Sequence, residues 1–457
     1  MIREGRAEQA QVFAGQNLVA HVVTESATTA SPAPRGEPEP ERMTEPVRYD
    51  FDRIIDRRRT NSEKWDLVGR LFGTEDALPM WVADMDFPCP EPVLEALRKR
   101  LDHPILGYGF PPDSLYEAVI DRMARRFGWT VEKEWITFTP GVVTAIYAAV
   151  RAISEPGDEI VLQPPVYHPF FSAVIDNGCQ VVPNRLKLEE PGELGGAGPG
   201  PRYVMDLEDL ARRFSGAEGF GARPHRIKGL ILCSPHNPVG RVWTPDELRR
   251  LSELCLANGC VVISDEIHCD LMIGESRHTP TAALSPETAR NTITLMAPSK
   301  TFNLAGLEAS FAVIPDPQLR RRFEEARRGQ SGVNVLGLVA MEAALRDGDD
   351  YLDQLNAYLT ENVRCFAEAV AGIPGVRLVP ARGPEGTYLA WVDLRGLGVE
   401  DAALEDFMFR RARLATDPGY IFGPGGEGFH RVNLACPRSI VREAVQRLRA
   451  AVERLGA

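Results

Sequence analysis

The chain has 457 residues, of which 44% are hydrophobic and 25% are charged, and its 52 basic and 64 acidic side chains give a net charge of −12. This balance is typical of a globular protein with enough apolar material for a large core, divided into two or three domains. So acidic a chain lacks the positive surface that sequence-independent binding to nucleic acid or to an anionic membrane needs, and neither is expected as a partner. No apolar stretch approaches the ~20 residues of a membrane-spanning helix.

Residues 1–46 differ from the rest of the chain. They are rich in Ala, Glu, Thr, Ser and Pro and show no sustained helical or strand period. Such a segment cannot bury enough apolar surface to offset the entropy lost on ordering, so we expect a disordered N-terminal extension. Its apolar part is broken by polar residues, which is unlike the continuous core of a signal peptide.

The eight cysteines are scattered and form neither a dense disulfide framework nor a CxxC pair. Cys255, Cys260, His268 and Cys269 lie close together in the sequence and could be read as a metal site. Cys260, however, opens an apolar run that is typical of a buried strand, where free thiols are common. We therefore expect no metal, and reduced thiols favour the cytoplasm as the compartment.

From Tyr49 onward, strand-like and helical patterns alternate. Helices are expected at 92–101, 112–127, 142–153 and 245–258, and strands at 159–162, 179–182, 229–233, 260–264, 292–296 and 310–314. This alternation predicts an α/β fold with a mostly parallel sheet covered by helices on both faces. A long helical region over 318–371 leads into a smaller α+β unit with strands near 376–379, 388–392 and 429–434, and 189–201 and 215–224 are predicted surface loops.

Lys300 lies in the segment Ala297-Pro298-Ser299-Lys300-Thr301-Phe302-Asn303, directly after a predicted strand. A lysine among small and apolar residues loses its proton more readily than a surface lysine, because burial disfavours the charged form. A neutral amine is what condensation with an aldehyde to a Schiff base requires.

Two further side chains follow neighbouring strands. Asp265 comes after the apolar run 260–263, and Asn237, in Ser234-Pro235-His236-Asn237-Pro238-Val239-Gly240, comes after 229–233. In an open parallel sheet, ligands bind at the carboxyl edge, where such residues gather. There a carboxylate can keep a pyridine nitrogen protonated, and an amide can donate to a phenolic oxygen, which is what pyridoxal phosphate (PLP) needs.

Asn237, Asp265 and Lys300 in this order resemble the fold-type-I PLP enzymes of aminotransferase class I and II. Within that superfamily the chain resembles the MalY/PatB-like cystathionine β-lyase (C–S lyase) branch. The similarity extends over about 49–455, and four stretches carry it: 51–66, 79–87, 299–307 and 433–438. The resemblance implies a large domain with a mostly parallel seven-stranded sheet and a smaller α+β domain. The corresponding divisions are a 1–46 extension, an N-terminal arm with part of the small domain (47–95), a large PLP-binding domain (96–330) and a C-terminal small domain (331–457).

The resemblance also implies residue roles. Lys300 would hold the cofactor, Asp265 would pair with its ring nitrogen, Asn237 with its phenolic oxygen, and Tyr167 would stack on its ring and contribute to catalysis. The phosphate would be bound by backbone N–H groups at a helix start, those of Gly141, Val142 and Val143, and by the Ser299 hydroxyl. His268 would border the cofactor, and Tyr108 would reach it from the other subunit of a homodimer. Arg438 would bind the substrate's α-carboxylate. Tyr108, Tyr167 and Asn237 are expected to border the substrate as well.

The expected reaction is β-elimination from cystathionine or another S-substituted L-cysteine, giving a thiol, pyruvate and ammonia. Many class I aminotransferases carry an arginine eight residues after the lysine, where this chain has Glu308. The lyase branch commonly lacks that arginine, and since a carboxylate beside a phosphate is unfavourable, we expect Glu308 to point elsewhere. An aminotransferase or a decarboxylating deaminase with the same residues remains an alternative, as does a regulatory or binding protein that retains the fold.

Overall fold

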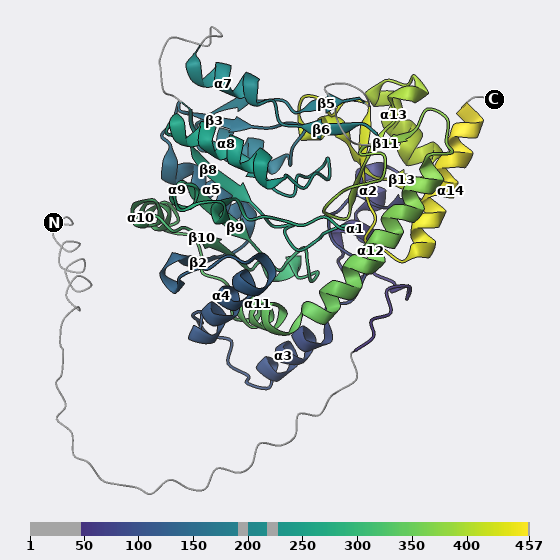
Figure 1. Cartoon of the computed structure of the whole chain (residues 1–457). Coiled ribbons are helices and arrows are strands. Elements are labelled where there is room, and N and C mark those ends of the chain that lie inside the picture. Colours follow the sequence, from purple (N-terminus) through teal and green to yellow (C-terminus); the bar gives the residue numbers. More distant parts are fainter. Residues whose placement is uncertain (1–46, 191–199, 217–226, 456–457) are drawn as a thin grey trace, which may run out of the picture. The chain divides into compact units, whose positions relative to one another are not determined.

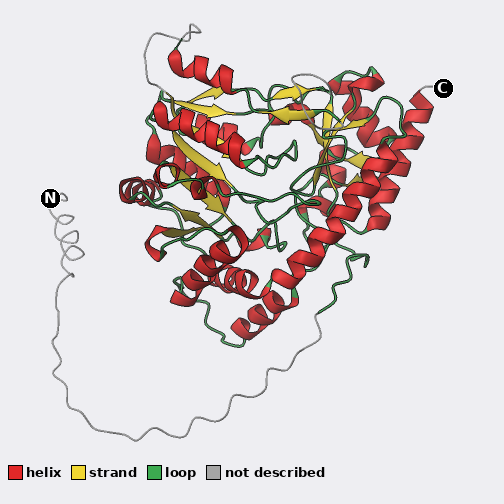
Figure 2. Cartoon of the chain, in the orientation of Figure 1, coloured by secondary structure: helices red, strands yellow, loops and turns green. Residues whose placement is uncertain are grey.

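A seven-stranded sheet forms the centre of the computed structural model, which describes residues 47–190, 200–216 and 227–455 (Figures 1 and 2). Its strands follow the order β2-β10-β9-β8-β7-β3-β4. They are β2 (Ile136–Thr139), β3 (Glu159–Leu162), β4 (Gln180–Pro183), β7 (Ile227–Cys233), β8 (Val261–Asp265), β9 (Thr292–Met296) and β10 (Ser310–Val313). The pairs from β4 to β9 are parallel, and only β10 runs against both of its neighbours. The predicted α/β fold with a mostly parallel sheet is therefore confirmed.

Helices cover both faces of this sheet. Not all helices lie against it; some pack elsewhere. The helices of the part of the chain before β10 are α1 (Glu63–Asp66), α2 (Val68–Phe72), α3 (Glu91–Leu101), α4 (Asp113–Phe127), α5 (Val142–Ile153), α6 (Pro169–Ile175), α7 (Leu207–Ser215), α8 (Pro245–Ala257) and α9 (Pro286–Arg290). After β10 follow α10 (Pro317–Ala326), α11 (Val335–Asp347), α12 (Asp349–Val370), α13 (Asp401–Asp406) and α14 (Arg438–Leu455). None of the helices in the described ranges is both long and apolar enough to cross a bilayer.

Side chains of β7 show how the two faces are built. Ile231 and Cys233 pack with α5 in one apolar cluster, whereas Leu230 and Leu232 pack with α8 in another. Because successive side chains of a strand point to opposite faces, a strand buried between two helical layers needs apolar side chains on both faces, as in the run from Leu230 to Cys233.

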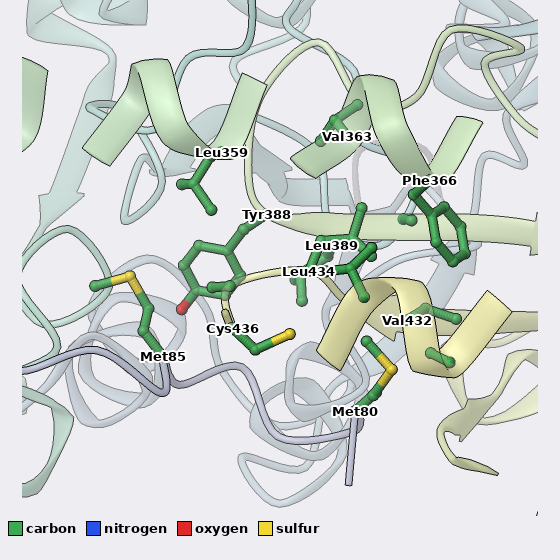
Figure 3. Packing of buried hydrophobic residues seen from close by; sticks show 14 of the residues in the cluster. Met80, Met85, Leu359, Val363, Phe366, Tyr388, Leu389, Val432, Leu434 and Cys436 are labelled. Carbon is green, nitrogen blue, oxygen red and sulfur yellow. The ribbon is translucent and has the colours of Figure 1, made fainter. Parts of the chain in front are cut away.

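A second sheet lies in the C-terminal part, where α12 and α14 pack together with it (Figure 1). It has the order β11-β12-β15-β14, with β11 (Arg377–Leu378), β12 (Leu389–Asp393), β14 (Asp417–Pro418) and β15 (Phe429–Asn433). Figure 3 shows Leu359, Val363 and Phe366 of α12 above Leu389 and Val432 of this sheet. Met80 and Met85 belong to the same cluster, so the N-terminal arm shares a core with the C-terminal sheet.

Two short pairs complete the strands. The arm contributes β1 (Leu78–Pro79), which pairs in parallel with β13 (Leu414–Ala415). β5 (Lys187–Glu189) and β6 (Arg202–Val204) form an antiparallel pair on either side of 191–199.

The predicted elements agree with the observed ones in most places. The helix 142–153 and the strands 159–162 and 292–296 have the predicted bounds, whereas the helical region 318–371 consists of α10, α11 and α12. The strand β2 was not predicted. The expectations for 1–46 and for most of 189–201 and 215–224 concern residues outside the described ranges. The domain boundaries at 95 and 330 remain a prediction, because residues 47–457 form one compact unit.

Candidate active site

The carboxyl ends of β7, β8 and β9 bring the predicted catalytic residues together. The three strands are adjacent, and their register aligns Cys233 with Asp265 and Asp265 with Leu295. Asn237 follows β7, Asp265 ends β8, and Lys300 lies in the turn after β9. All three side chains therefore reach the edge of the sheet at which ligands bind in this class of fold.

A cavity of about 230 Å³ opens at this edge. It is lined by Ala83, Pro140, Gly141, Val142, Val143, Thr144, Tyr167, Cys233, Asn237, Asp265, Ile267, His268, Ser299, Lys300, Ala305, Glu308 and Ala309. Nine of the predicted site residues are in this set: Gly141, Val142, Val143, Tyr167, Asn237, Asp265, His268, Ser299 and Lys300.

Burial shifts the pKa values of the two central ionisable groups toward each other. The pKa of Lys300 is lowered to about 8, first by burial and then by the positive charge of Arg431. Burial raises the pKa of Asp265 to about 7, while a hydrogen bond from the Ile267 N–H and the charge of Lys300 oppose this shift. The prediction that Lys300 loses its proton more readily than a surface lysine is thus confirmed, because burial disfavours the charged form of both groups.

The backbone around Ala83 supports the Lys300 side chain. The carbonyl oxygen of Ala83 accepts hydrogen bonds from Lys300 Nζ and from the Tyr388 hydroxyl, each at 2.8 Å. Asn433 Nδ2 donates to the carbonyls on both sides, those of Val82 and Asp84, at 2.6 Å each. Since an amide is well suited to bridge two carbonyls, this segment is fixed from β15, and Lys300 meets an acceptor of defined position.

His268 and Tyr167 are the aromatic groups of the cavity. His268 is buried, and burial lowers the pKa of its imidazole to about 3, so that the ring is neutral. Its Nδ1 is buried without a hydrogen-bond partner among the described residues. Burial also raises the pKa of the Tyr167 hydroxyl. A neutral ring nitrogen without a partner is available to a polar ligand atom.

The N-terminus of α5 offers an anion site beside Ser299. Within an α-helix the first N–H groups have no partner, and here Val142 and Val143 supply them to the cavity. The N–H of Gly141 instead donates to the carbonyl of Thr139 at 2.9 Å. Gly141 therefore contributes through its shape: its φ of 92° turns the chain into the helix, and a Cβ at this position would meet no atom within 4 Å.

Glu308 lies at the rim of this cavity. Its backbone is in the left-handed region with φ 47°, and its side chain is exposed. Glu308 is part of the lining, and the expectation that its carboxylate points elsewhere remains a prediction. Since the side chain is exposed, water screens the carboxylate.

The predicted carboxylate-binding Arg438 lies outside the cavity lining. At the start of α14, its guanidinium stacks on the Tyr358 ring at 4.6 Å, and its Nε donates to Asn362. The guanidinium that contacts a lining residue is that of Arg431 of β15. Arg431 is not itself part of the lining, but it is buried and donates from Nη1 to Asn237 Oδ1 at 3.0 Å. The sequence did carry a signal for it, since an arginine within a predicted strand of the small α+β unit needs a partner when that strand is buried.

Tyr108 is likewise absent from the lining. It lies in the loop between α3 and α4 and is fully exposed. The residues around it in space, among them Phe110 and Val335, form a separate hollow of about 360 Å³. The structure of one chain thus leaves Tyr108 outward-facing, as a residue that acts on another subunit would be.

These groups fit pyridoxal phosphate. The cavity holds an amine with a lowered pKa for the aldehyde, a buried carboxyl for the ring nitrogen, and helix N–H groups with a hydroxyl for the phosphate. The Nδ1 of His268, which has no protein partner in the described ranges, supports the same conclusion. For a metal, by contrast, the described residues contain no group of three or more His, Cys, Asp or Glu side chains that could bind one.

Comparison with known proteins identifies the class. Residues 76–448 match the model of the aminotransferase class I and II family, and the chain belongs to this family. It is 44% identical to the cystathionine beta-lyase PatB of Bacillus subtilis over 406 residues, which cover 88% of this chain and 99% of that protein. The crystal structure of cystalysin from Treponema denticola, which contains pyridoxal 5'-phosphate, is similar with a TM-score of 0.82 and 35% identity over 90% of this chain and 100% of the other. The PLP-bound C–S lyase of Staphylococcus hominis is similar with a TM-score of 0.79 and 33% identity over 89% and 98%.

Proposed function

We propose that the protein is a PLP-dependent carbon–sulfur β-lyase that cleaves cystathionine or another S-substituted L-cysteine. The observation that carries this proposal is the meeting of Lys300, Asp265 and Asn237 in one cavity of a chain that is 44% identical to a cystathionine beta-lyase over almost that protein's full length. In the overall reaction, the S-substituted cysteine and one water give a thiol, pyruvate and ammonia. The Cβ–S bond breaks with its electron pair leaving on sulfur, so no oxidant or reductant is needed.

When bound, PLP supplies an electron sink for the electron pair that remains when the Cα proton is removed. The Asp265 carboxylate would hold the ring nitrogen in its protonated state, and Asn237 would orient the phenolic oxygen. Lys300 would hold the cofactor and then move the Cα proton. A pKa of about 8 suits this task, because a sizeable fraction of the amine is neutral near neutral pH.

Arg431 is the residue that we propose for the substrate's α-carboxylate, in place of Arg438. Its guanidinium is buried and bonded to Asn237 of the cavity, and its charge lowers the pKa of Lys300. Its Nε is buried without a hydrogen-bond partner among the described residues. A planar guanidinium with a free donor matches a carboxylate well.

We also propose a homodimer in which Tyr108 contributes to the site of the partner subunit. The loop around Tyr108 exposes several large apolar side chains, namely Leu101, Ile105, Leu106 and Phe110. Contiguous exposed apolar groups of this kind mark an interaction surface.

The eight cysteines are all free, which supports the reducing cytoplasm as the compartment.

Phe110→Asp should separate such a dimer, because a charge would be buried against the partner. We expect the variant to have the mass of one chain in light scattering and to lose most of its activity. Ile175→Asp is the matched control, since Ile175 of α6 is similarly exposed but belongs to another surface, and it should stay dimeric. A fully active monomer would contradict the role of Tyr108.

The function is tested with a panel of S-substituted L-cysteines, including cystathionine, assayed for thiol, pyruvate and ammonia in the absence of any keto acid. Stoichiometric release of all three is expected, and Lys300→Ala should abolish it. Turnover that depends on an added keto-acid acceptor would favour an aminotransferase instead, and loss of carbon dioxide a decarboxylating deaminase. Binding of the cofactor without turnover of any member would favour a regulatory protein.

A further inference from the structure

Asp417 of β14 and Arg431 of β15 form a buried cross-strand ion pair. The two residues are direct register partners of the antiparallel strands, and Arg431 Nη2 contacts Asp417 Oδ2. Both residues are buried, with 12% of the Asp417 side chain and 5% of the Arg431 side chain exposed. The same Nη2 donates to the carbonyl of Trp81 at 3.0 Å, and the guanidinium stacks on Phe422 at 4.9 Å.

These contacts fix the orientation of Arg431 from two sides. Nη2 is directed toward Asp417 and Trp81, whereas Nη1 is directed toward Asn237 of the cavity. Because the Trp81 carbonyl and the Phe422 ring hold the guanidinium as well, its orientation does not depend on the charge of Asp417 alone.

The charge of Asp417 acts on the same end of the cavity. It contributes to the raised pKa of Tyr167, a residue of the lining on which Arg431 acts in the opposite direction. An incoming carboxylate therefore meets a guanidinium that already has a carboxylate partner. In a buried place, attraction to Arg431 and repulsion by Asp417 are both only weakly screened.

We propose that Asp417 is a positioning and specificity-determining residue that weakens the binding of α-carboxylates to Arg431. The inference rests on the proposed function, in which Arg431 binds the substrate's carboxylate. As a consequence, the product pyruvate leaves readily, because its carboxylate binds to the same guanidinium as the substrate's carboxylate and is attracted to it equally weakly.

Asp417→Asn tests this inference in the holoenzyme. The amide has the same shape and still accepts a hydrogen bond from Arg431, but it carries no charge. We expect the variant to bind pyruvate about three- to tenfold more tightly than the wild type does, and the KM of the amino acid to fall in parallel. Pyruvate binding is measured as competitive inhibition of thiol release and by titration of the cofactor's absorption. Pyruvamide, which has no carboxylate, should bind equally to the variant and to the wild type.

Asp393→Asn is the matched control. Asp393 of β12 is a buried carboxylate of the same sheet that pairs with Arg377 and Arg395, and it lies outside the cavity lining. Its variant should leave pyruvate binding unchanged. Asp417→Ala removes both the charge and the hydrogen-bond acceptor of the side chain, and it should also bind pyruvate more tightly. It replaces the asparagine variant in this test if that variant does not fold.

Two results would overturn the inference. The first is unchanged or weaker pyruvate binding in a folded, cofactor-loaded Asp417 variant. The second is an equal change in the binding of pyruvate and pyruvamide, because a general loosening of the structure would affect both ligands. The absorption titration does not require turnover. Failure of the wild type to release pyruvate from any substrate would therefore refute the proposed function, whereas an active enzyme with an unaltered Asp417 variant would refute only this inference.

Discussion

Asp265 is a buried carboxyl whose ionised form the folded chain disfavours. With a pKa of about 7 in the chain without cofactor, it takes up a proton well above the pH at which an unfolded aspartate does. Its ionisation therefore destabilises the folded state, by an amount that grows as the pH rises from about 4 to about 7 and is then constant. A cationic ring nitrogen placed against it would remove this penalty.

Asp265→Asn should consequently separate stability from activity. We expect the cofactor-free variant to be more stable than the cofactor-free wild type at pH 8, by about 2–4 kcal/mol, and equally stable at pH 4, as measured by urea unfolding. In the holoenzyme the same change should lower kcat by about 10²-fold or more, because the amide cannot hold the ring nitrogen protonated. Equal stability at pH 8 would contradict the role of burial in the raised pKa.

Sequence reasoning located those site residues whose position follows from the end of a strand. Lys300, Asp265 and Asn237 each follow an apolar strand, and parallel strands end at one edge. The resemblance over 433–438 implied Arg438 for the substrate's carboxylate, but at the start of α14 the Arg438 guanidinium contacts Tyr358 and Asn362. Which arginine turns inward depends on strand pairing in the second sheet, and this long-range packing is not visible in local sequence.

Among the helices and strands, those at 142–153, 159–162 and 292–296 were predicted to the residue, whereas other apolar strands were predicted with ends shifted by one or two residues. α5 is an example, since the glycine turn before Val142 and the apolar stripe along the helix define both of its ends. The strand β2, Ile136–Thr139, alternates too briefly to be distinguished from a loop, and its place beside β10 is set by a partner far away in the sequence. Gly348 separates α11 from α12, a break that helical spacing alone does not predict.

The start of α5 also allows a prediction about the cofactor. Gly141→Ala adds a methyl group that meets no neighbour, but it forces an L-residue to adopt a φ of 92°. Relief of this strain should move Val142 and Val143 and weaken PLP binding about tenfold, which fluorescence titration of the cofactor-free chain measures.

Gly128→Ala is the control for this experiment. Gly128 ends α4 with a φ of 62° and likewise has no atom within 4 Å of an added Cβ, but it lies outside the cavity lining. Its variant should lose similar stability and bind PLP as the wild type does. Equal weakening in both variants would show that general destabilisation, and not the helix start, is responsible.

For the whole molecule, acid sensitivity follows from three histidines that the fold buries as neutral rings. Burial lowers the pKa of His236 to about 4 and those of His268 and His430 to about 3. An unfolded histidine takes up its proton near pH 6.5, so between about pH 6.5 and 4 these three side chains bind more protons in the unfolded chain than in the folded one. The contribution of each histidine to the free energy of unfolding therefore falls as the pH falls through this range, by about 1.4 kcal/mol per pH unit.

Proton uptake measures this linkage without any assumption about the number of unfolding steps. When urea unfolds the cofactor-free chain at pH 5.5 in weak buffer, His430→Asn should take up about one proton fewer than the wild type. His430 suits this test because its Nδ1 is paired with Thr416 Oγ1 inside the second sheet, away from the cavity lining, and asparagine can keep a hydrogen bond to that hydroxyl. His103, between α3 and α4, is the reference: His103→Asn should leave the uptake unchanged, because this side chain is already exposed to water in the folded chain. The same uptake from His430→Asn as from the wild type would mean that the buried ring is already charged in the folded protein, and the fold would then tolerate acid better than its neutral histidines imply.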